Sequence, residues 1–196
     1  MSTTAWRTAW TILVCGAVIG AISLGIRHSF GLYLQPISMA NGWGREVFGF
    51  AMAIQNLVWG VAQPFAGYAA DRWGAGRVIA CGAALYALGL GLMALPLDAP
   101  AFILAAGLLI GLGLAGTTFP IIFGVISRVM PAEQRSLAFG IAMAVGSFGQ
   151  FVMLPVALGL IDGIGWAQSL LVMTALSTLI LPLALVLARP GAAGAP

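Results

Sequence analysis

The chain has 196 residues, of which 61% are hydrophobic and only 7% are charged. Soluble globular domains carry roughly 25% charged residues, so a chain of this composition could not hide its apolar surface from water. Lipid must be the solvent for most side chains, which predicts a polytopic membrane protein. The formal net charge of +3 comes from scattered arginines. No basic patch with interleaved aromatic residues is present, which argues against a nucleic-acid partner.

Six apolar segments follow one another along the chain, and each reaches or nearly reaches the ~20 residues that a helix needs to cross a bilayer. Lipid cannot hydrogen-bond to backbone groups, so these segments should be helices. The expected fold is an all-α, six-helix transmembrane bundle over residues 1–189, followed by a cytoplasmic loop or tail at residues 190–196. The expected spans are residues 9–34, 47–66, 78–95, 100–126, 136–160 and 166–188.

The arginines predict how the bundle is oriented. If the N-terminus is cytoplasmic, only Arg45 lies outside, and Arg27 lies within the first span. Six arginines then lie inside: Arg7, Arg72, Arg77, Arg128, Arg135 and Arg189. The positive-inside rule therefore places both termini in the cytoplasm. Arginine without any lysine, together with abundant alanine and glycine, favours a bacterial source and hence the cytoplasmic (inner) membrane.

Arg27 lies within the first span, toward its outer end. A cation inside the bilayer costs roughly 2.5–3.5 kcal/mol on insertion scales, so such a residue usually faces a cavity. No carboxylate lies at a similar depth in any span. We hypothesise that Arg27 binds an anionic substrate, and a carboxylate suits its planar guanidinium. The alternative is a structural arginine that caps helix carbonyls or pairs with an acid outside this chain.

Further polar residues in the spans are candidates for a substrate path. His28 is either a proton-sensitive group or a hydrogen-bonded packing residue. Gln55 and Asn56 in the second span, Thr117 in the fourth and Gln150 in the fifth either line a polar cavity or join helices through hydrogen bonds. The sequence leaves both alternatives open for each of them.

Glycines and prolines recur inside the spans. Small residues such as Gly140, Gly146 and Gly149 let helix backbones approach one another closely, either for static packing or for helices that must also slide. Prolines such as Pro120 and Pro155 remove a helix hydrogen bond and favour a kink, which transporters use near binding sites.

Metal, cofactor and enzyme sites are not expected. Cys15 and Cys81 both fall inside spans and form neither a disulfide framework nor a metal-binding pattern. An intramembrane enzyme would need catalytic groups that converge within the spans. The five acidic residues all lie at span ends or in loops.

A short charged stretch, Gly67–Arg77, lies between the second and third spans. It should form a tight cytoplasmic turn, in which Gly67 and Gly74 permit positive φ angles or close backbone approach. Asp71 can pair with an arginine or lie at the positive end of a helix. The two arginines of the stretch would hold the turn on the cytoplasmic side. An ordinary positive-inside loop is the simpler alternative.

This stretch resembles the loop between helices 2 and 3 of the major facilitator superfamily of secondary transporters. The family pattern is Gly-x-x-x-Asp-Arg/Lys-x-Gly-x-Arg/Lys-Arg/Lys. The matching residues are Gly67, Asp71, Arg72, Gly74 and Arg77, whereas Gly76 departs from the pattern. The resemblance implies that these residues form part of a cytoplasmic gate, together with Arg128 and Arg135 of the loop between the fourth and fifth spans. Asp71 would pair with one of those two arginines.

Residues 135–147 resemble the fifth-helix signature of the monocarboxylate porters, with one extra residue at Val145. That branch carries a cation in its first helix, near the positions of Arg27 and His28. The acidic-Gly-Gly-Trp segment that precedes helix 1 in the branch is absent. The superfamily's helix-4 arginine is also missing, since Gly107 occupies about that position, and so is the Gly-Pro antiporter motif. Proton-coupled drug export is therefore less favoured.

The resemblance covers the whole chain but only the amino-terminal half of a twelve-helix fold. It implies a secondary active transporter, or half of one, that moves a small organic anion such as a monocarboxylate by alternating access, with a proton as a candidate coupling ion in a symporter. Spans one, two, four and five would line the path. The second half would be a missing part of a longer protein or another copy in a homodimer. The alternatives are an exporter of another small molecule, such as a drug, or a non-transporting membrane subunit.

Overall fold

The computed structural model describes residues 3–188, and the side chains of residues 8–188. Throughout this range the regular structure is helical, which confirms the expected all-α class. The predicted tail at residues 190–196 and Arg189 lie outside the described residues, as does the side chain of Arg7.

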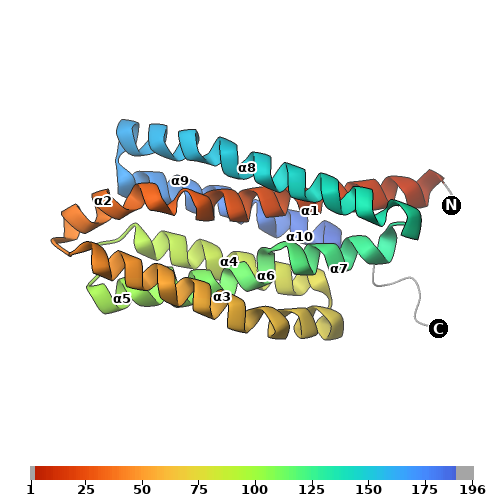
Figure 1. Cartoon of the computed structure of the whole chain (residues 1–196), viewed down its shortest axis with the longest axis horizontal. Coiled ribbons are helices and arrows are strands. Elements are labelled where there is room, and N and C mark those ends of the chain that lie inside the picture. The colour runs from red at the N-terminus through yellow and green to blue at the C-terminus, as the bar shows by residue number, and fades with distance from the viewer. Residues whose placement is uncertain (1–2, 189–196) are drawn as a thin grey trace.

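The helices group into six segments that run side by side (Figure 1). The first segment comprises α1 (Thr3–His28) and α2 (Phe30–Asn41). The second is α3 (Arg45–Trp73), and the third is α4 (Ala75–Met93). The fourth comprises α5 (Ala99–Ile103), the π-helical η1 (Leu104–Leu109), α6 (Ile110–Thr117) and α7 (Phe119–Val129). After the short 3₁₀ helix η2 (Ala132–Gln134), the fifth is α8 (Arg135–Ile164), and the sixth comprises α9 (Trp166–Thr178) and α10 (Ile180–Ala188).

Five of these segments are long and apolar enough to cross a membrane. The exception among the described residues is the second segment, the 29-residue helix α3. It is long enough to cross, but Gln55, Asn56 and Gln63 lower its mean hydropathy. Polar side chains in a membrane-spanning helix face the bundle interior or a cavity rather than lipid. The amides therefore indicate a functional or packing role for α3.

Helices extend past two of the expected span boundaries. The first segment continues to Asn41 instead of ending near residue 34, and the single turn residue Ser29 separates α1 from α2. The predicted turn at residues 67–77 is much tighter than expected, because α3 stays helical to Trp73. Gly74, at φ +94°, alone separates α3 from α4. Gly67 lies inside α3 with an ordinary negative φ, so the expectation of positive φ or close approach there was wrong.

The connections alternate between the two ends of the bundle (Figure 1). The turn between α3 and α4 and the loop between α7 and α8 lie at the end where α1 begins. The connections from α4 to α5 and from α8 to α9 lie at the opposite end. Successive segments therefore run antiparallel, and Gly74 and Asp98 lie at opposite ends. A membrane-crossing bundle requires this arrangement.

Glycines set the distances between neighbouring helices. A Cβ atom added at Gly82 of α4 would lie 2.9 Å from the carbonyl oxygen of Gly113 and from Cα of Gly116 in α6. Such contacts replace the hydrophobic driving force that helices lack in lipid. On the same segment, Gly107 and Gly111 face α3 with similarly short distances. The glycine-rich fourth segment therefore packs closely against both the second and the third segments.

Candidate substrate-binding face and gate

Several glycines of the first, second and fourth segments have no other helix packed directly over them. A Cβ atom added at Gly31 of α2, at Gly60 or Gly67 of α3, or at Gly124 of α7 would have no atom within 4 Å. These glycines belong to the first, second and fourth segments. Gly67 and Gly124 line one small cavity across α3 and α7. We call the surface formed by these four glycines and Asn56 the open face.

α3 shows why the open face differs from a surface that touches lipid. One exposed stripe of α3 carries the small or polar residues Ala53, Asn56 and Gly60. The other carries bulky apolar side chains, including Leu57 and Val61, which are 62% and 59% exposed. Bulky apolar side chains suit hydrocarbon, whereas polar side chains in spans face a cavity or another helix. The open face is therefore the side of α3 suited to a polar path.

Arg27 lies near the end of α1, and its side chain reaches α3 at the edge of the open face. Its Nη2 donates a hydrogen bond of 3.1 Å to the Oδ1 atom of Asn56. Its guanidinium carbon lies 5.8 Å from the ring centroid of Phe30, on the next helix. Its Nε atom is buried and has no hydrogen-bond partner. Among the described residues, neither a helix carbonyl nor a carboxylate holds this guanidinium, so part of its hydrogen-bonding capacity is unused.

A buried polar network supports the helix that carries Arg27. The hydroxyl of Tyr86 in α4 donates a 2.9 Å hydrogen bond to the carbonyl oxygen of Ser23 in α1. The hydroxyl of Ser23 lies 3.1 Å from the carbonyl oxygen of Thr117 in α6. Tyr86, Ser23 and Thr117 are all fully buried. This network joins α1, α4 and α6 one turn before Arg27.

The other predicted binding residues divide into two groups. Gln55 is fully buried and donates a 2.6 Å hydrogen bond to the carbonyl oxygen of Ala106, and the hydroxyl of Thr117 bonds to its own helix. For these two residues the structure favours the packing alternative. Asn56 and His28 are exposed, and Gln150 is half-buried. Only Asn56 is brought into hydrogen-bond contact with Arg27.

His28 contacts a backbone carbonyl of its own helix. Its Nδ1 atom lies 3.2 Å from the carbonyl oxygen of Leu24. A carbonyl oxygen can only accept, so Nδ1 carries the hydrogen in this contact and Nε2 is the acceptor nitrogen.

The fourth segment is discontinuous, whereas Pro120 predicted only a kink. Thr118 has extended backbone angles (φ −102°, ψ 172°) and separates α6 from α7. Its hydroxyl lies 2.9 Å from the carbonyl oxygen of Leu114 and 3.4 Å from Oε1 of Gln63. The indole N–H of Trp59 donates to the same hydroxyl at 3.3 Å. Side chains of α3 thus satisfy polar groups at the break, as membrane helices require.

This network was missed as a unit, although the sequence carried a partial signal. Trp59 and Gln63 lie four residues apart on one face of α3, and Thr118 stands two residues before a proline. The ring of Phe119, which follows the break, is enclosed by Gly20 of α1 and Gly146 of α8. Cβ atoms added at these glycines would lie 2.8 and 2.4 Å from the ring. No sequence pattern indicates which residues would face this ring.

The predicted gate residues meet in one pair. Arg128 of α7 forms a salt bridge with Asp71 near the end of α3, and both side chains are more than half exposed. Gly67 and Gly124 leave room for this pair, in a cavity of about 180 Å³. An exposed salt bridge of this kind contributes about 0–1 kcal/mol to stability. The pair can therefore open at little energetic cost.

The remaining gate candidates have other contacts. The Nε of Arg135 donates a 3.2 Å hydrogen bond to the carbonyl oxygen of Met130, within its own loop. Arg72 donates to the hydroxyl of Tyr68 at 3.4 Å. Arg77 is exposed and lies beside a groove between α3 and α4. Asp71 is thus paired with Arg128, and Arg135 does not reach it.

Comparisons with known proteins agree with this architecture. The sequence model of the Major Facilitator Superfamily matches residues 5–196. Monocarboxylate transporter 11 of Homo sapiens is 28% identical over 190 residues, which are 95% of this chain and 40% of that protein. The oxalate:formate antiporter of Oxalobacter formigenes is 26% identical over 188 residues, which are 95% of this chain and 44% of that protein.

A third relative, the probable anion transporter 4 of Arabidopsis thaliana chloroplasts, is 33% identical over 122 residues, which are 61% of this chain and 22% of that protein. The chain spans about two fifths of the length of the first two of these relatives. All three of these relatives are named as transporters or antiporters and not as enzymes. The chain is a membrane-integral member of the Major Facilitator Superfamily, similar to its monocarboxylate transporters.

Proposed function

We propose that this chain forms half of a secondary active transporter that moves a small organic anion, most simply a monocarboxylate, by alternating access. The observation that carries the proposal is the state of Arg27. Its Nε–H is buried without a partner, and one Nη–H is bonded to a neutral amide. A guanidinium with unused donors beside a polar face suits a carboxylate, which accepts two parallel hydrogen bonds.

The names of the relatives support the same substrate class. They include monocarboxylate transporters, an anion transporter and an oxalate:formate antiporter. All of these names refer to the transport of anions or carboxylates. We infer that a carboxylate binds between Arg27 and Asn56 on the open face, with His28 nearby as the candidate proton carrier.

The open face would complete the path with a second six-helix unit. That unit would come from a longer form of the protein or from a second copy. Rocking of the two units would expose the anion to each side of the membrane in turn. The Asp71–Arg128 pair would close the end that carries the α3–α4 turn. By the positive-inside rule this end would be cytoplasmic, in a bacterial inner membrane, since Arg72, Arg77, Arg128 and Arg135 all belong to it.

Binding of radiolabelled pyruvate to the full chain in nanodiscs tests the proposal without requiring a complete transport cycle. A hydrogen bond to a charged group contributes about 1.5–3 kcal/mol, so Arg27→Gln should weaken binding about tenfold to a hundredfold. Arg27→Lys keeps the charge but loses the planar fork, so it should bind with intermediate affinity. Arg45→Gln, at the start of α3, is the matched control and should bind like the unmodified chain.

Equal binding by the unmodified chain and Arg27→Gln would contradict the anion assignment. Saturable counterflow of pyruvate in vesicles would distinguish a carrier from a non-transporting subunit. Uptake driven by an imposed pH gradient, and lost in a His28→Gln variant, would identify a proton symporter. Selective binding of an uncharged hydrophobic compound instead of pyruvate would favour a drug-type exporter.

A further inference from the structure

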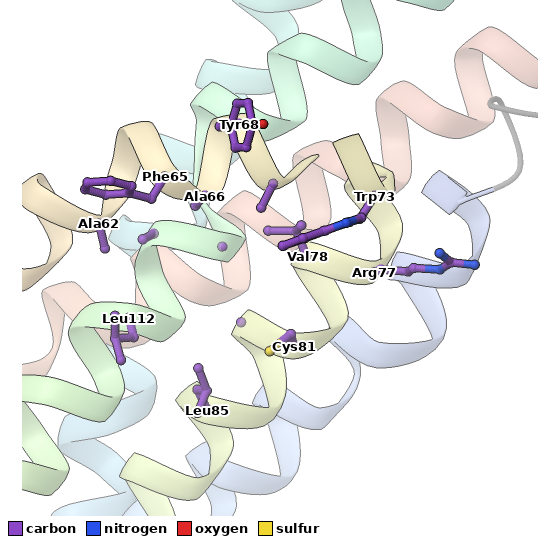
Figure 2. A pocket seen from close by; sticks show the side chains of 14 residues that line it. Ala62, Phe65, Ala66, Tyr68, Trp73, Arg77, Val78, Cys81, Leu85 and Leu112 are labelled. Carbon is purple, nitrogen blue, oxygen red and sulfur yellow. The ribbon is translucent and has the colours of Figure 1, made fainter. Parts of the chain in front are cut away.

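A wide cavity in the described part of the chain lies away from the open face. It is a groove of about 710 Å³ between α3, α4 and α6. Figure 2 shows Phe65 of α3, Leu112 of α6 and Cys81 and Leu85 of α4 around one space. Gly82 and Gly116, at the close contact of α4 with α6, belong to its lining. We call it the lateral groove.

The lateral groove and the gate lie on different sides of α3. The gate cavity is lined by Gly67 and Asp71 of α3, together with residues of α7. The lateral groove is lined by Phe65, Tyr68 and Trp73, whose side chains are 70%, 64% and 59% exposed. Exposed aromatic and apolar side chains on a membrane-spanning bundle require hydrocarbon or another apolar partner. The lining therefore suits an acyl chain and not a carboxylate substrate.

One end of the lateral groove is positively charged. Figure 2 shows Arg77 at this end, beyond Trp73 and Val78. Arg72 precedes the turn and donates a hydrogen bond to Tyr68, one of the lining residues. The acid of this turn, Asp71, is already paired with Arg128. The charge of the two arginines at the groove is thus not cancelled by the acid of the turn.

Aromatic and basic residues together mark the boundary between hydrocarbon and headgroups. Tryptophan and tyrosine concentrate at the membrane–water interface, where their apolar rings and polar atoms are both accommodated. Trp73 is the last residue of α3, directly before the turn. The groove is apolar along its length and ends in Trp73, Arg72 and Arg77. A phospholipid has the matching order of groups, an apolar acyl chain followed by a charged headgroup.

We propose that the lateral groove binds one anionic glycerophospholipid from the leaflet that the α3–α4 turn faces. An acyl chain would lie along Phe65, Cys81 and Leu112, and the phosphate would contact Arg77. A basic residue near a membrane surface favours anionic over zwitterionic lipids. The proposed lipid holds α3 against α4 next to the gate. This inference is independent of the anion assignment at Arg27.

Photo-crosslinking of the full chain in phosphatidylcholine nanodiscs tests the inference. The probes are phosphatidylglycerol and phosphatidylcholine that carry the same diazirine on one acyl chain, and mass spectrometry maps the labelled residues. The phosphatidylglycerol probe should label groove residues more strongly than the phosphatidylcholine probe. Arg77→Gln should reduce its labelling about fivefold, since one basic residue near the surface contributes about 1 kcal/mol. Arg45→Gln, at the other end of α3, should leave labelling unchanged.

A second variant tests the groove itself. Cys81 is exposed, so Cys81→Trp should fill the lateral groove without disturbing the core, and it should abolish labelling by both probes at an unchanged unfolding temperature. Equal labelling by the two probes in the unmodified chain and in Arg77→Gln would overturn the proposal. Label confined to other surfaces would do the same. Oxidative Cys81–Cys81 crosslinks between copies in a Cys15→Ser background would show that a second chain occupies the groove instead.

Discussion

The contact between α1 and α8 gives the sharpest prediction about packing. A Cβ atom added at Gly149 would lie 2.6 Å from Cβ of Ala21 and 2.7 Å from its Cα and carbonyl oxygen. Carbon atoms pack at roughly 3.5–4.0 Å, so Gly149→Ala would force the two helices apart. Two of the three contacted atoms belong to the backbone of α1. A change of side-chain rotamer therefore cannot relieve the clash.

Gly140 on the same helix is the matched control, because an added Cβ atom there has nothing within 4 Å. Overpacking typically costs about 1–3 kcal/mol, which is the expected destabilisation for Gly149→Ala. At Gly140 no clash arises, and alanine is the better helix former. Gly140→Ala should therefore stabilise the helix by roughly 1 kcal/mol. The two substitutions are chemically identical. A loss of stability for Gly149→Ala together with a gain for Gly140→Ala would therefore isolate the effect of the contact with Ala21.

Thermal unfolding in a single detergent, followed by tryptophan fluorescence, measures the difference. For a chain of 150–250 residues, 1 kcal/mol shifts the midpoint by about 2–4 °C. The midpoint should therefore fall by about 2–12 °C for Gly149→Ala. The midpoint of Gly140→Ala should stay unchanged or rise. A midpoint for Gly149→Ala equal to or above that of Gly140→Ala would refute the close contact between α1 and α8.

Three further substitutions probe the polar sites. Asn56→Asp places a carboxylate at hydrogen-bond distance from Arg27, so pyruvate binding should be lost. Asn56→Ser adds no charge and should retain binding. Undiminished binding by Asn56→Asp would count against Arg27 as the anion site. Asp71→Asn removes an exposed salt bridge, so the free energy of unfolding should change by only about 0–1 kcal/mol. The rate of pyruvate counterflow should change. A larger loss of stability would show that the pair has a structural role instead. Gln55→Met removes one hydrogen bond, which contributes about 0.5–1.5 kcal/mol to stability. It also removes a buried carbonyl oxygen that has no partner, and such an oxygen costs the folded state about 1–3 kcal/mol. The unfolding midpoint of Gln55→Met should therefore be equal or higher, and a clear fall would contradict this balance.

The helical class and the order of the six segments were predictable because hydrocarbon imposes a length and a composition on every crossing helix. The helix ends were less predictable, because helices continue past the apolar run for as long as their backbone hydrogen bonds can form. α3 extends from the apolar residues through Asp71 to Trp73, and it ends where Gly74 adopts a positive φ. A prediction based on the length of the apolar run cannot detect this extension of the helix.

The direction of individual polar side chains was the part that could not be predicted. Gln55 and Asn56 are adjacent amides, yet Gln55 is fully buried against the fourth segment and Asn56 is exposed beside Arg27. Adjacent residues on a helix point about 100° apart, so only the positions of the neighbouring helices decide which amide joins the packing. Asp71 pairs with Arg128, whereas Arg135 bonds to its own loop, and the positions of the neighbouring helices decide this pairing in the same way.

A paired substitution on α3 tests whether the open face is the transport path. Gly60 lies one turn after Asn56 on the open face, and an added Cβ atom there meets no other atom. Val61 is the next residue, at the same depth, but it belongs to the bulky apolar stripe. If the open face lines the path, Gly60→Phe should block counterflow of pyruvate, whereas Val61→Phe should leave it intact.

Stability separates this outcome from simple misfolding. Both phenylalanines are placed on exposed positions, so neither variant should lower the unfolding midpoint of the chain. Loss of transport in Gly60→Phe at an unchanged midpoint would then come from obstruction of the face and not from a damaged bundle. Equal transport by the two variants would mean that both stripes of α3 face lipid, and the substrate path would have to be sought on another surface.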